Sequence, residues 1–340
     1  MQNINEKQRL LGVLKGEIQD RPPVICPGGM MNAAVSEIVK NIHGNHNVTS
    51  EAMVAAAKLV REMAGFENYG VPFCMTVESE PFGIKLDFGD KEREPVVTEY
   101  NELDISEIIS KYNEVEFNSY RIPVVLKAIG ELKNDSVPVI GNITGAISTA
   151  TSVVDPLVLF KLMRKAPEKA YEFIAFINKN LVDYAEKMLD RGADVIVISD
   201  PTATGEILGK VNFEKFAVPM FKEIAEMVHK RNAKLIIHIC GNTNSIIESL
   251  NLIGADAYSF DSVVNIKTSK DKINSKIMGN VSTQLLQDGT PEKIMLNTKH
   301  CIDSGSDIIS PACGLGMSTP VINLKAMTAL VKGENNNAID

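Results

Sequence analysis

Short apolar segments recur along the whole chain, and this repetition constrains the fold more than any other feature of the sequence. The segments are rich in valine and isoleucine, and lie at 23–28, 69–76, 137–142, 194–200, 234–240, 256–261, 276–280 and 307–313. Hydrophobicity that is continuous rather than alternating is typical of strands buried on both faces. Amphipathic stretches such as 167–191 and 212–231 lie between the segments and are long enough to form crossover helices. The pattern therefore predicts parallel strands that alternate with helices.

The junctions that lead into the later segments repeat one arrangement of residues. Arg191-Gly-Ala-Asp194, Ile253-Gly-Ala-Asp256 and Ser304-Gly-Ser-Asp307 each join an amphipathic stretch to an apolar segment. Because a glycine often ends a helix, each junction indicates the order helix, glycine, aspartate, strand. Reuse of one such unit is typical of a parallel sheet.

The number of segments bears on the closure of the sheet. Eight strands in 340 residues favour an α/β fold of the closed (β/α)8 TIM type over an open doubly wound sheet. A dinucleotide-binding sheet would need a GxGxxG turn after an early strand, and none occurs there. We expect a single domain over 1–335 and a polar tail at 336–340. The polar, acidic region near 82–120 is predicted to be an insertion or a long connection within the domain.

The composition indicates an ordered protein and excludes several kinds of partner. Hydrophobic residues make up 44% of the chain and charged residues 23%, which is enough to bury a sizeable core. The net charge of −8 and the lack of a basic cluster argue against nucleic acid as a partner. No apolar run reaches the roughly 18 residues that cross a bilayer, and the N-terminus lacks the apolar centre of a signal peptide. We therefore expect a cytoplasmic protein without a membrane partner.

Polar and sulfur-containing residues gather where the predicted strands end. In a barrel of this kind the active site lies at the carboxyl ends of the strands. Four of the five cysteines fall at such ends, whereas Cys301 lies within a predicted helix. The residues at or just beyond these ends are Cys26, Cys74, Glu78, Asn142, Thr144, Asp200, His238, Cys240, Asp261, Asn280 and Cys313.

The segment His238-Ile239-Cys240 is the most informative of these ends. Residues two apart on a strand point to the same face, so His238 and Cys240 project together near the barrel mouth. Zn²⁺ binds imidazole nitrogen and thiolate sulfur tightly, and Cys313 is well placed to supply a third ligand. A histidine and a cysteine that merely pack in the core are the alternative reading of this segment.

Three protein ligands would leave one coordination position open, which is typical of a catalytic zinc rather than a structural one. A centre with two thiolates suits the binding of an incoming thiol, because zinc lowers the pKa of the thiol and keeps its sulfur nucleophilic. Hydrolysis by a zinc-bound water is the competing use, and sites rich in histidine and carboxylate favour it more. We accordingly assign His238, Cys240 and Cys313 both as metal ligands and as catalytic residues.

Other residues at the strand ends keep more than one interpretation. Cys26 and Cys74 could each be a fourth ligand, a second thiol near the site, or a core residue. Asp200 could hold an imidazole, contact substrate, or cap a helix. The candidates for substrate binding are Cys74, Glu78, Asn142, Asp200 and Asn280.

The remaining histidines are weaker candidates for metal ligands. His43 and His46 lie in a polar segment and are expected to be exposed to solvent. His229 falls on a charged helix face, and His300 lies beside Cys301.

These residues resemble a known family. The chain is similar to the methylcobamide:coenzyme M methyltransferases, a zinc-dependent branch of the uroporphyrinogen decarboxylase superfamily, over nearly its whole length. The His-x-Cys pair with a distant cysteine is the specific part of the resemblance. The other matching segments mark the superfamily, and the densest matches lie at 14–24, 65–78, 192–201, 238–242, 279–282 and 311–326.

The resemblance implies a TIM-type barrel in which His238, Cys240 and Cys313 hold one Zn²⁺ ion per chain. It implies that a methyl group comes from a methylated corrinoid on a separate protein and passes to a thiol, coenzyme M in this family. The chain also has no Asp-x-His-x-x-Gly segment for a corrinoid of its own. The sequence leaves open how many chains assemble, and a homo-oligomer is compatible with it.

Three alternatives stay open at this point. A corrinoid methyltransferase of opposite direction would demethylate a methyl ether or a methylated amine, and the zinc ligands alone do not separate the two directions. Uroporphyrinogen decarboxylases carry an arginine-rich N-terminal segment for substrate carboxylates, and Cys26-Pro-Gly-Gly-Met-Met stands in its place here. A non-catalytic zinc or corrinoid-protein binding module would require a closed site with four protein ligands, for example with Cys26 or Cys74 as the fourth, that an added thiol does not exchange.

Overall fold

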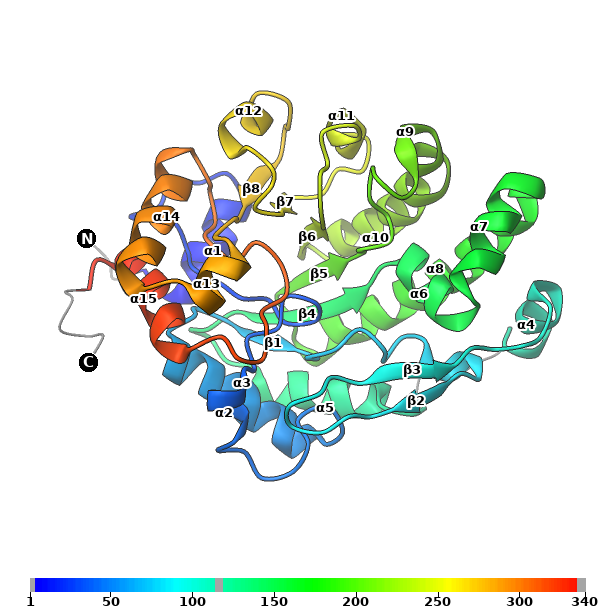
Figure 1. Ribbon diagram of the computed structural model, residues 1–340, viewed down its shortest axis with the longest axis horizontal. Helices are drawn as coiled ribbons and strands as arrows, with labels where there is room; N and C mark the ends of the chain where they lie inside the picture. Colours follow the sequence, from blue (N-terminus) through cyan, green and yellow to red (C-terminus); the bar gives the residue numbers. More distant parts are fainter. Residues whose placement is uncertain (1–3, 114–118, 335–340) are drawn as a thin grey trace.

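Parallel strands surrounded by helices form the body of the protein (Figure 1). The computed structural model describes residues 4–113 and 119–334. Six strands pair in parallel in the order β1 (Tyr69–Val71), β4 (Val139–Thr144), β5 (Val195–Ser199), β6 (Lys234–Ile239), β7 (Ala257–Phe260) and β8 (Lys276–Met278). Their order in the sheet follows their order in the chain, as the repeated strand–helix unit predicts.

Two further segments complete the ring between β8 and β1. Val24 forms a parallel bridge with Ile309, and Ile308 forms one with Met278 of β8. On the other side, the amide of Glu67 donates to the carbonyl of Val24 at 2.9 Å. All eight predicted segments therefore take their places in a closed (β/α)8 barrel.

The first and last of these segments form isolated bridges rather than strands, which differs from the prediction. Pro22 and Pro23 precede Val24, Pro27 follows it closely, and Pro311 interrupts the last segment. A proline has no amide hydrogen to donate, so neither segment can extend a regular ladder.

The repeated glycine–aspartate junctions have a clear structural role. Gly192 ends helix α8 (Pro167–Arg191) with a left-handed φ of 108°. Two residues later, the carboxylate of Asp194 accepts from the amide of Val139 at 2.9 Å, and its own amide donates to the carbonyl of Val139. Asp256 makes the same two bonds to Leu235, and Asp307 makes them to Ile277. Each aspartate thus ties the start of its strand to the start of the preceding one.

The longer helices lie outside the strands (Figure 1). Besides α8, they are α3 (Ser50–Ala64), α5 (Ile122–Leu132), α10 (Val218–Lys230), α14 (Pro291–Asp303) and α15 (Val321–Lys332). Within the described ranges no single helix is long and apolar enough to cross a membrane. Helices α6 (Ala146–Val153) and α7 (Pro156–Lys165) meet those criteria only as a pair, and they are bent by 115° at their junction.

Short elements form the connections between strands and outer helices. They are α2 (Ser36–Val39), α9 (Gly209–Asn212), the π-helical turn η2 (Phe213–Ala217), α11 (Ile247–Leu250), α12 (Ile266–Lys270) and α13 (Thr283–Asp288). The region predicted as an insertion holds the 3-10 turn η1 (Glu80–Phe82), an antiparallel hairpin of β2 (Lys85–Asp87) and β3 (Val96–Glu99), and α4 (Ile105–Lys111). Residues 114–118 and the predicted tail at 336–340 lie outside the described residues.

Helix α1 (Glu6–Leu14) closes the amino-terminal end of the barrel. Its start carries a capping box in which the side chains of Asn5 and Gln8 each accept from the other's amide. Leu10 of this helix is fully buried against apolar side chains that the strands direct inward, among them Ile140, Val197 and Ile236. The barrel interior is therefore a packed core at this end, and chemistry is confined to the opposite end.

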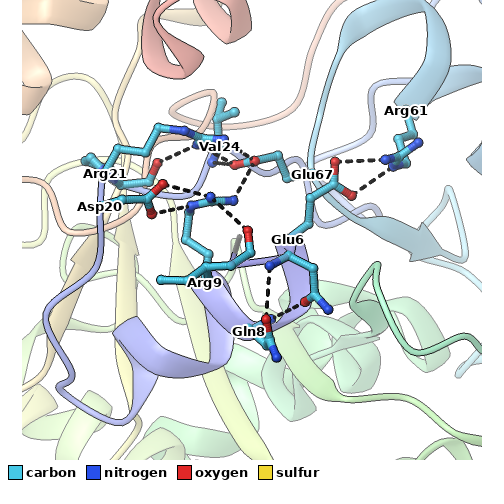
Figure 2. Close-up of polar contacts among 11 residues, drawn as sticks. Glu6, Gln8, Arg9, Asp20, Arg21, Val24, Arg61 and Glu67 are labelled. Carbon is cyan, nitrogen blue, oxygen red and sulfur yellow. Dashed lines mark hydrogen bonds and ion pairs between the residues drawn. The ribbon is translucent and has the colours of Figure 1, made fainter. Parts of the chain in front are cut away.

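A buried ion-pair network holds α1 to the barrel (Figure 2). The Glu67 carboxylate, 2% exposed, lies 3.2 Å from the Arg9 guanidinium and 2.5 Å from that of Arg21. It also accepts from the amide of Val24 at 2.9 Å, and Arg9 pairs with Asp20 at 2.8 Å. Burial alone would raise the pKa of Glu67, but hydrogen bonds from Arg21 and Val24 hold it below its usual value.

We expect Glu67→Gln to lower the free energy of unfolding by about 3 kcal/mol, because two guanidinium groups lose their buried counter-charge. Asp303→Asn is the matched control, since its ion pair with Lys299 is exposed and should contribute less than about 1 kcal/mol. Urea unfolding at neutral pH measures both variants. Equal losses in the two variants would contradict a stabilising role for the buried network.

Candidate metal centre

His238, Cys240 and Cys313 meet at the carboxyl end of the barrel. Their ligand atoms all lie within 4.8 Å of one another. The Cys240 sulfur lies 3.2 Å from His238 Nε2 and 3.2 Å from the Cys313 sulfur. His238 belongs to β6, and Cys240 is the first residue after this strand. Cys313 follows the bridge between Val281 and Pro311. His238 is fully buried and the two cysteines are half-buried, so the cluster faces the mouth.

Ser259 holds the imidazole of His238 in place. The two residues are direct partners in the register of β6 and β7, and Ser259 Oγ lies 3.0 Å from His238 Nδ1. When Nδ1 donates to this oxygen, the lone pair of Nε2 faces the cysteines, which is the tautomer that a metal ligand needs. The sequence analysis did not select Ser259. The signal that could have found it is the pairing of His238 with a residue of the next strand.

A hydrogen bond between the two cysteines shifts their pKa values in opposite directions. The contact from the Cys240 thiol lowers the pKa of Cys313, and His238 lowers it further, although burial opposes both effects. The same contact raises the pKa of Cys240. One proton shared by two sulfurs leaves the pair with negative charge, which favours a cation beside it.

The donor set and its spacing fit one Zn²⁺ ion. Zinc–sulfur bonds of about 2.3 Å place two sulfurs of a tetrahedral site roughly 3.7 Å apart. The sulfurs of Cys240 and Cys313 lie 3.2 Å apart, so they need to separate by only about half an ångström to accept the ion. One imidazole nitrogen and two sulfurs are a typical set for a zinc centre with an open position.

The other two candidate cysteines lie outside this cluster. The thiol of Cys26 donates to the carbonyl of Met31 at 2.9 Å, and burial raises its pKa. Cys74 is also buried, with its sulfur 3.3 Å from a guanidinium nitrogen of Arg121 and 3.6 Å from the hydroxyl of Thr76. Neither groups with the three clustered ligands.

Asp200 caps a helix that neighbours its own strand. Its carboxylate accepts from the amides of Ile147 and Ser148 at 3.0 Å each, and from the Ser148 hydroxyl at 2.6 Å. These bonds complete the start of α6, whose own N-cap residue, Gly145, has no side chain to do so. Asp200 therefore caps α6, which precedes it in the chain, rather than a helix that follows it, and contact of Asp200 with substrate stays a prediction. Ser259, not Asp200, holds the imidazole of His238.

Two asparagines among the candidates bind backbone carbonyls. Asn142 donates to Pro27 at 2.6 Å and to Val71 at 3.2 Å, which joins the first two segments of the ring. Asn280 donates to Asp261 and Val264 at 2.9 Å each. These bonds shape the loops at the mouth, and contact of either residue with substrate stays a prediction.

The prediction that His46 is exposed is wrong. Its ring is 2% exposed and meets the ring of Phe73 edge-on at 5.5 Å between centroids. Burial, with a smaller effect from Lys91, lowers the pKa of His46 to about 4. The polar residues around His46 suggested a solvated loop, but long-range packing of this segment was not visible in its composition. His43, in contrast, is exposed as predicted.

The remaining residues that sequence reasoning set aside also lie away from the centre. His229 is 40% exposed and lies 2.9 Å from a carboxylate oxygen of Asp256. Cys301 is buried in α14, with its sulfur 3.6 Å from the side-chain oxygen of Asn280.

Glu78 is a buried carboxyl group at the mouth. Its two oxygens accept from the amide of Thr144 at 2.9 Å and from the hydroxyl of the same residue at 3.1 Å. Burial raises the pKa of Glu78 to about 7 even though both hydrogen bonds favour the charged form. Ionisation of Glu78 therefore costs stability in the folded protein.

Glu78→Gln tests this directly. The folded state of the wild type retains the Glu78 proton up to about pH 7, whereas an ordinary glutamate loses it near 4.5. The wild type should therefore lose roughly 3 kcal/mol of unfolding free energy relative to Glu78→Gln as the pH rises through this window. The exposed Glu37→Gln should follow the wild type in the same chemical denaturation series. Parallel curves for wild type and Glu78→Gln would contradict a protonated buried carboxyl.

The family of the chain emerges from comparison with known proteins. The family model described as Uroporphyrinogen decarboxylase (URO-D) matches residues 5–333. The methylcobamide:CoM methyltransferase MtbA of Methanosarcina acetivorans is 30% identical over 337 residues, which span 98% of this chain and 99% of that protein. A methylated-thiol–coenzyme M methyltransferase of Methanosarcina mazei is 27% identical over 96% of this chain and 88% of its own length.

A solved structure agrees with this placement. A methyltransferase from Methanosarcina mazei superposes with a TM-score of 0.87 at 28% identity, over 97% of this chain and 99% of that one. Fold, length and sequence thus lead to one group of enzymes. The chain belongs to the uroporphyrinogen decarboxylase (URO-D) family and, within it, to the methylcobamide:CoM methyltransferases.

Proposed function

We propose that the protein transfers a methyl group from a methylated corrinoid, carried by a separate protein, to coenzyme M at the centre formed by His238, Cys240 and Cys313. The observation that carries this proposal is a cluster of one nitrogen and two half-buried sulfur donors at the mouth of the barrel. The relatives, which are methylcobamide:CoM and methylated-thiol–coenzyme M methyltransferases, suggest the methyl donor and the thiol. The cytoplasmic location expected from the composition is part of the same proposal.

The three donors prepare the centre for a thiol. When Zn²⁺ is bound, it supplies a cationic site that lowers the pKa of a thiol and keeps its sulfur nucleophilic. Ser259 binds Nδ1 of His238, so Nε2 is the nitrogen that would bind the ion. Once deprotonated, Cys240 and Cys313 would offset the two positive charges of the ion, so a thiolate held there would stay rich in electrons.

The loop after Cys240 keeps the donors in position. Gly241 adopts a left-handed φ of 66°, and its amide donates to the carboxylate of Asp261 at 3.1 Å. This bond links the ends of β6 and β7, the two strands that carry His238 and its partner Ser259. A pre-set geometry reduces the reorganisation that binding and reaction require.

The transfer balances without any further reactant. The thiol loses its proton to solvent, and its sulfur forms a bond to the methyl carbon. The cobalt–carbon bond breaks with its electron pair on cobalt, which leaves a methyl thioether and a cob(I)amide. The opposite direction, in which a methyl ether or methylated amine gives its methyl group to the corrinoid, is the alternative that the donor set itself allows.

Mixing zinc-loaded protein with free methylcobalamin and a panel of thiols tests the function. We expect coenzyme M to convert methylcobalamin to demethylated cobalamin faster than the other thiols do, as followed by the visible spectrum under anaerobic conditions. Demethylation no faster than with zinc-free protein would contradict the proposed function. Methylation of cob(I)alamin by an ether or amine, with no reaction of coenzyme M, would establish the alternative direction.

Cysteine variants test the ligands separately from the methyl donor. Cys240→Ala and Cys313→Ala should each lose bound zinc and nearly all activity while the barrel stays folded, because the ligands lie at the mouth and not in the packed core. Cys301→Ser, at a buried position of α14, is the matched control and should keep both metal and activity. Metal analysis and circular dichroism measure the outcome, and a metal-replete, active Cys313→Ala protein would remove Cys313 from the centre.

A further inference from the structure

The loop formed by residues 26–32 brings a methionine against the metal centre. Met30 Sδ lies 3.4 Å from the sulfur of Cys240. Met30 is half-buried, whereas Met31 beside it is fully buried, with its sulfur 3.6 Å from the hydroxyl of Ser259. The function proposed above uses neither side chain, although Met30 contacts one of its ligands.

Hydrogen bonds hold this loop in one conformation. The carbonyl of Met31 accepts from the amide of Gly28 at 3.1 Å and from the thiol of Cys26 at 2.9 Å, which closes a tight turn. Gly29 donates to the carbonyl of Pro72 at 2.7 Å, which ties the turn to the segment after β1. Both glycines have left-handed φ angles, of 103° and 58°, that other residues rarely adopt. The backbone therefore determines where Met30 lies.

Close packing around the loop supports the same conclusion. A Cβ atom on Gly70 would lie 1.6 Å from the carbonyl oxygen of Pro27, and one on Gly314 would lie 2.8 Å from that of Met30. Gly314 directly follows the ligand Cys313. The absence of side chains at Gly70 and Gly314 allows the loop to approach the centre, and it carries the sulfur of Met30 to the sulfur of Cys240.

We propose that the thioether of Met30 is the resident fourth ligand at the open position of the centre and that the incoming thiol displaces it. The inference rests on the proposed function in one respect, namely that the centre holds Zn²⁺. Ligands of a tetrahedral zinc site lie roughly 3.5–3.8 Å from one another. The 3.4 Å between Met30 Sδ and the Cys240 sulfur is close to that separation.

The chemistry of a thioether suits a ligand that must leave. It is a soft sulfur donor without charge, so it binds a thiolate-rich centre more weakly than an incoming thiolate does. Exchange breaks one metal–thioether bond and forms one metal–thiolate bond, and the proton of the thiol goes to solvent. Three rotatable bonds allow the half-buried side chain to swing out while the loop stays in place. Until then, Met30 keeps water from the open position.

Zinc-edge X-ray absorption of the holoprotein labelled with selenomethionine tests this inference without any substitution. We expect one selenium neighbour of zinc in addition to two sulfurs and one nitrogen. Coenzyme M should replace the selenium neighbour with a third sulfur. Met30→Leu should lose the selenium neighbour and gain an oxygen, and it should bind coenzyme M several-fold more tightly because no side chain competes. The half-buried Met63→Leu in α3 is the matched control and should behave as the wild type.

The outcomes separate this inference from the proposed function. A zinc centre with two sulfurs, one nitrogen and no selenium would overturn the assignment of Met30 and leave the proposed function standing. A selenium neighbour that persists in Met30→Leu would assign another methionine and would also overturn it. Protein that binds no zinc at all would instead contradict the proposed function.

Discussion

Closure of the parallel ring is the constraint on which the rest of the structure depends. The two bridges of Val24 with Ile309 and of Ile308 with Met278 complete the hydrogen bonding between the first and last segments. In an open sheet the end of the last segment would lie far from β6. The closed ring instead places Cys313 beside Cys240, so the cluster of candidate metal ligands depends on closure of the barrel.

The two ends of the barrel have different roles: one stabilises the fold, and the other carries the candidate metal ligands. At the amino-terminal end, α1 fills the interior, and Glu67 binds the guanidinium groups of Arg9 and Arg21 in a buried network. At the carboxyl end, polar groups such as the carboxyl group of Glu78 bind the ends of strands, here Thr144 of β4. The three candidate ligands therefore lie on a rigid frame, and the half-buried Met30 lies beside them.

The local hydrophobicity pattern predicted the fold well, because parallel strands buried on both faces appear in the sequence as continuous apolar runs. The junction aspartates, such as Asp194, were visible in the sequence as repeats, although their paired bonds to the preceding strand were not. His238, Cys240 and Cys313 could be selected because strand ends converge in a barrel. Ser259 and Met30 could not be selected from the sequence. The role of the serine depends on the strand register, and that of the methionine on a tertiary contact.

Anomalous diffraction at the zinc absorption edge, from crystals of the zinc-loaded protein, would locate the metal. We expect one peak at the barrel mouth, about 2.3 Å from the sulfurs of Cys240 and Cys313 and about 2.0–2.1 Å from His238 Nε2. A peak held by other residues, or no peak at this cluster in zinc-replete crystals, would show that these three residues do not form the metal site.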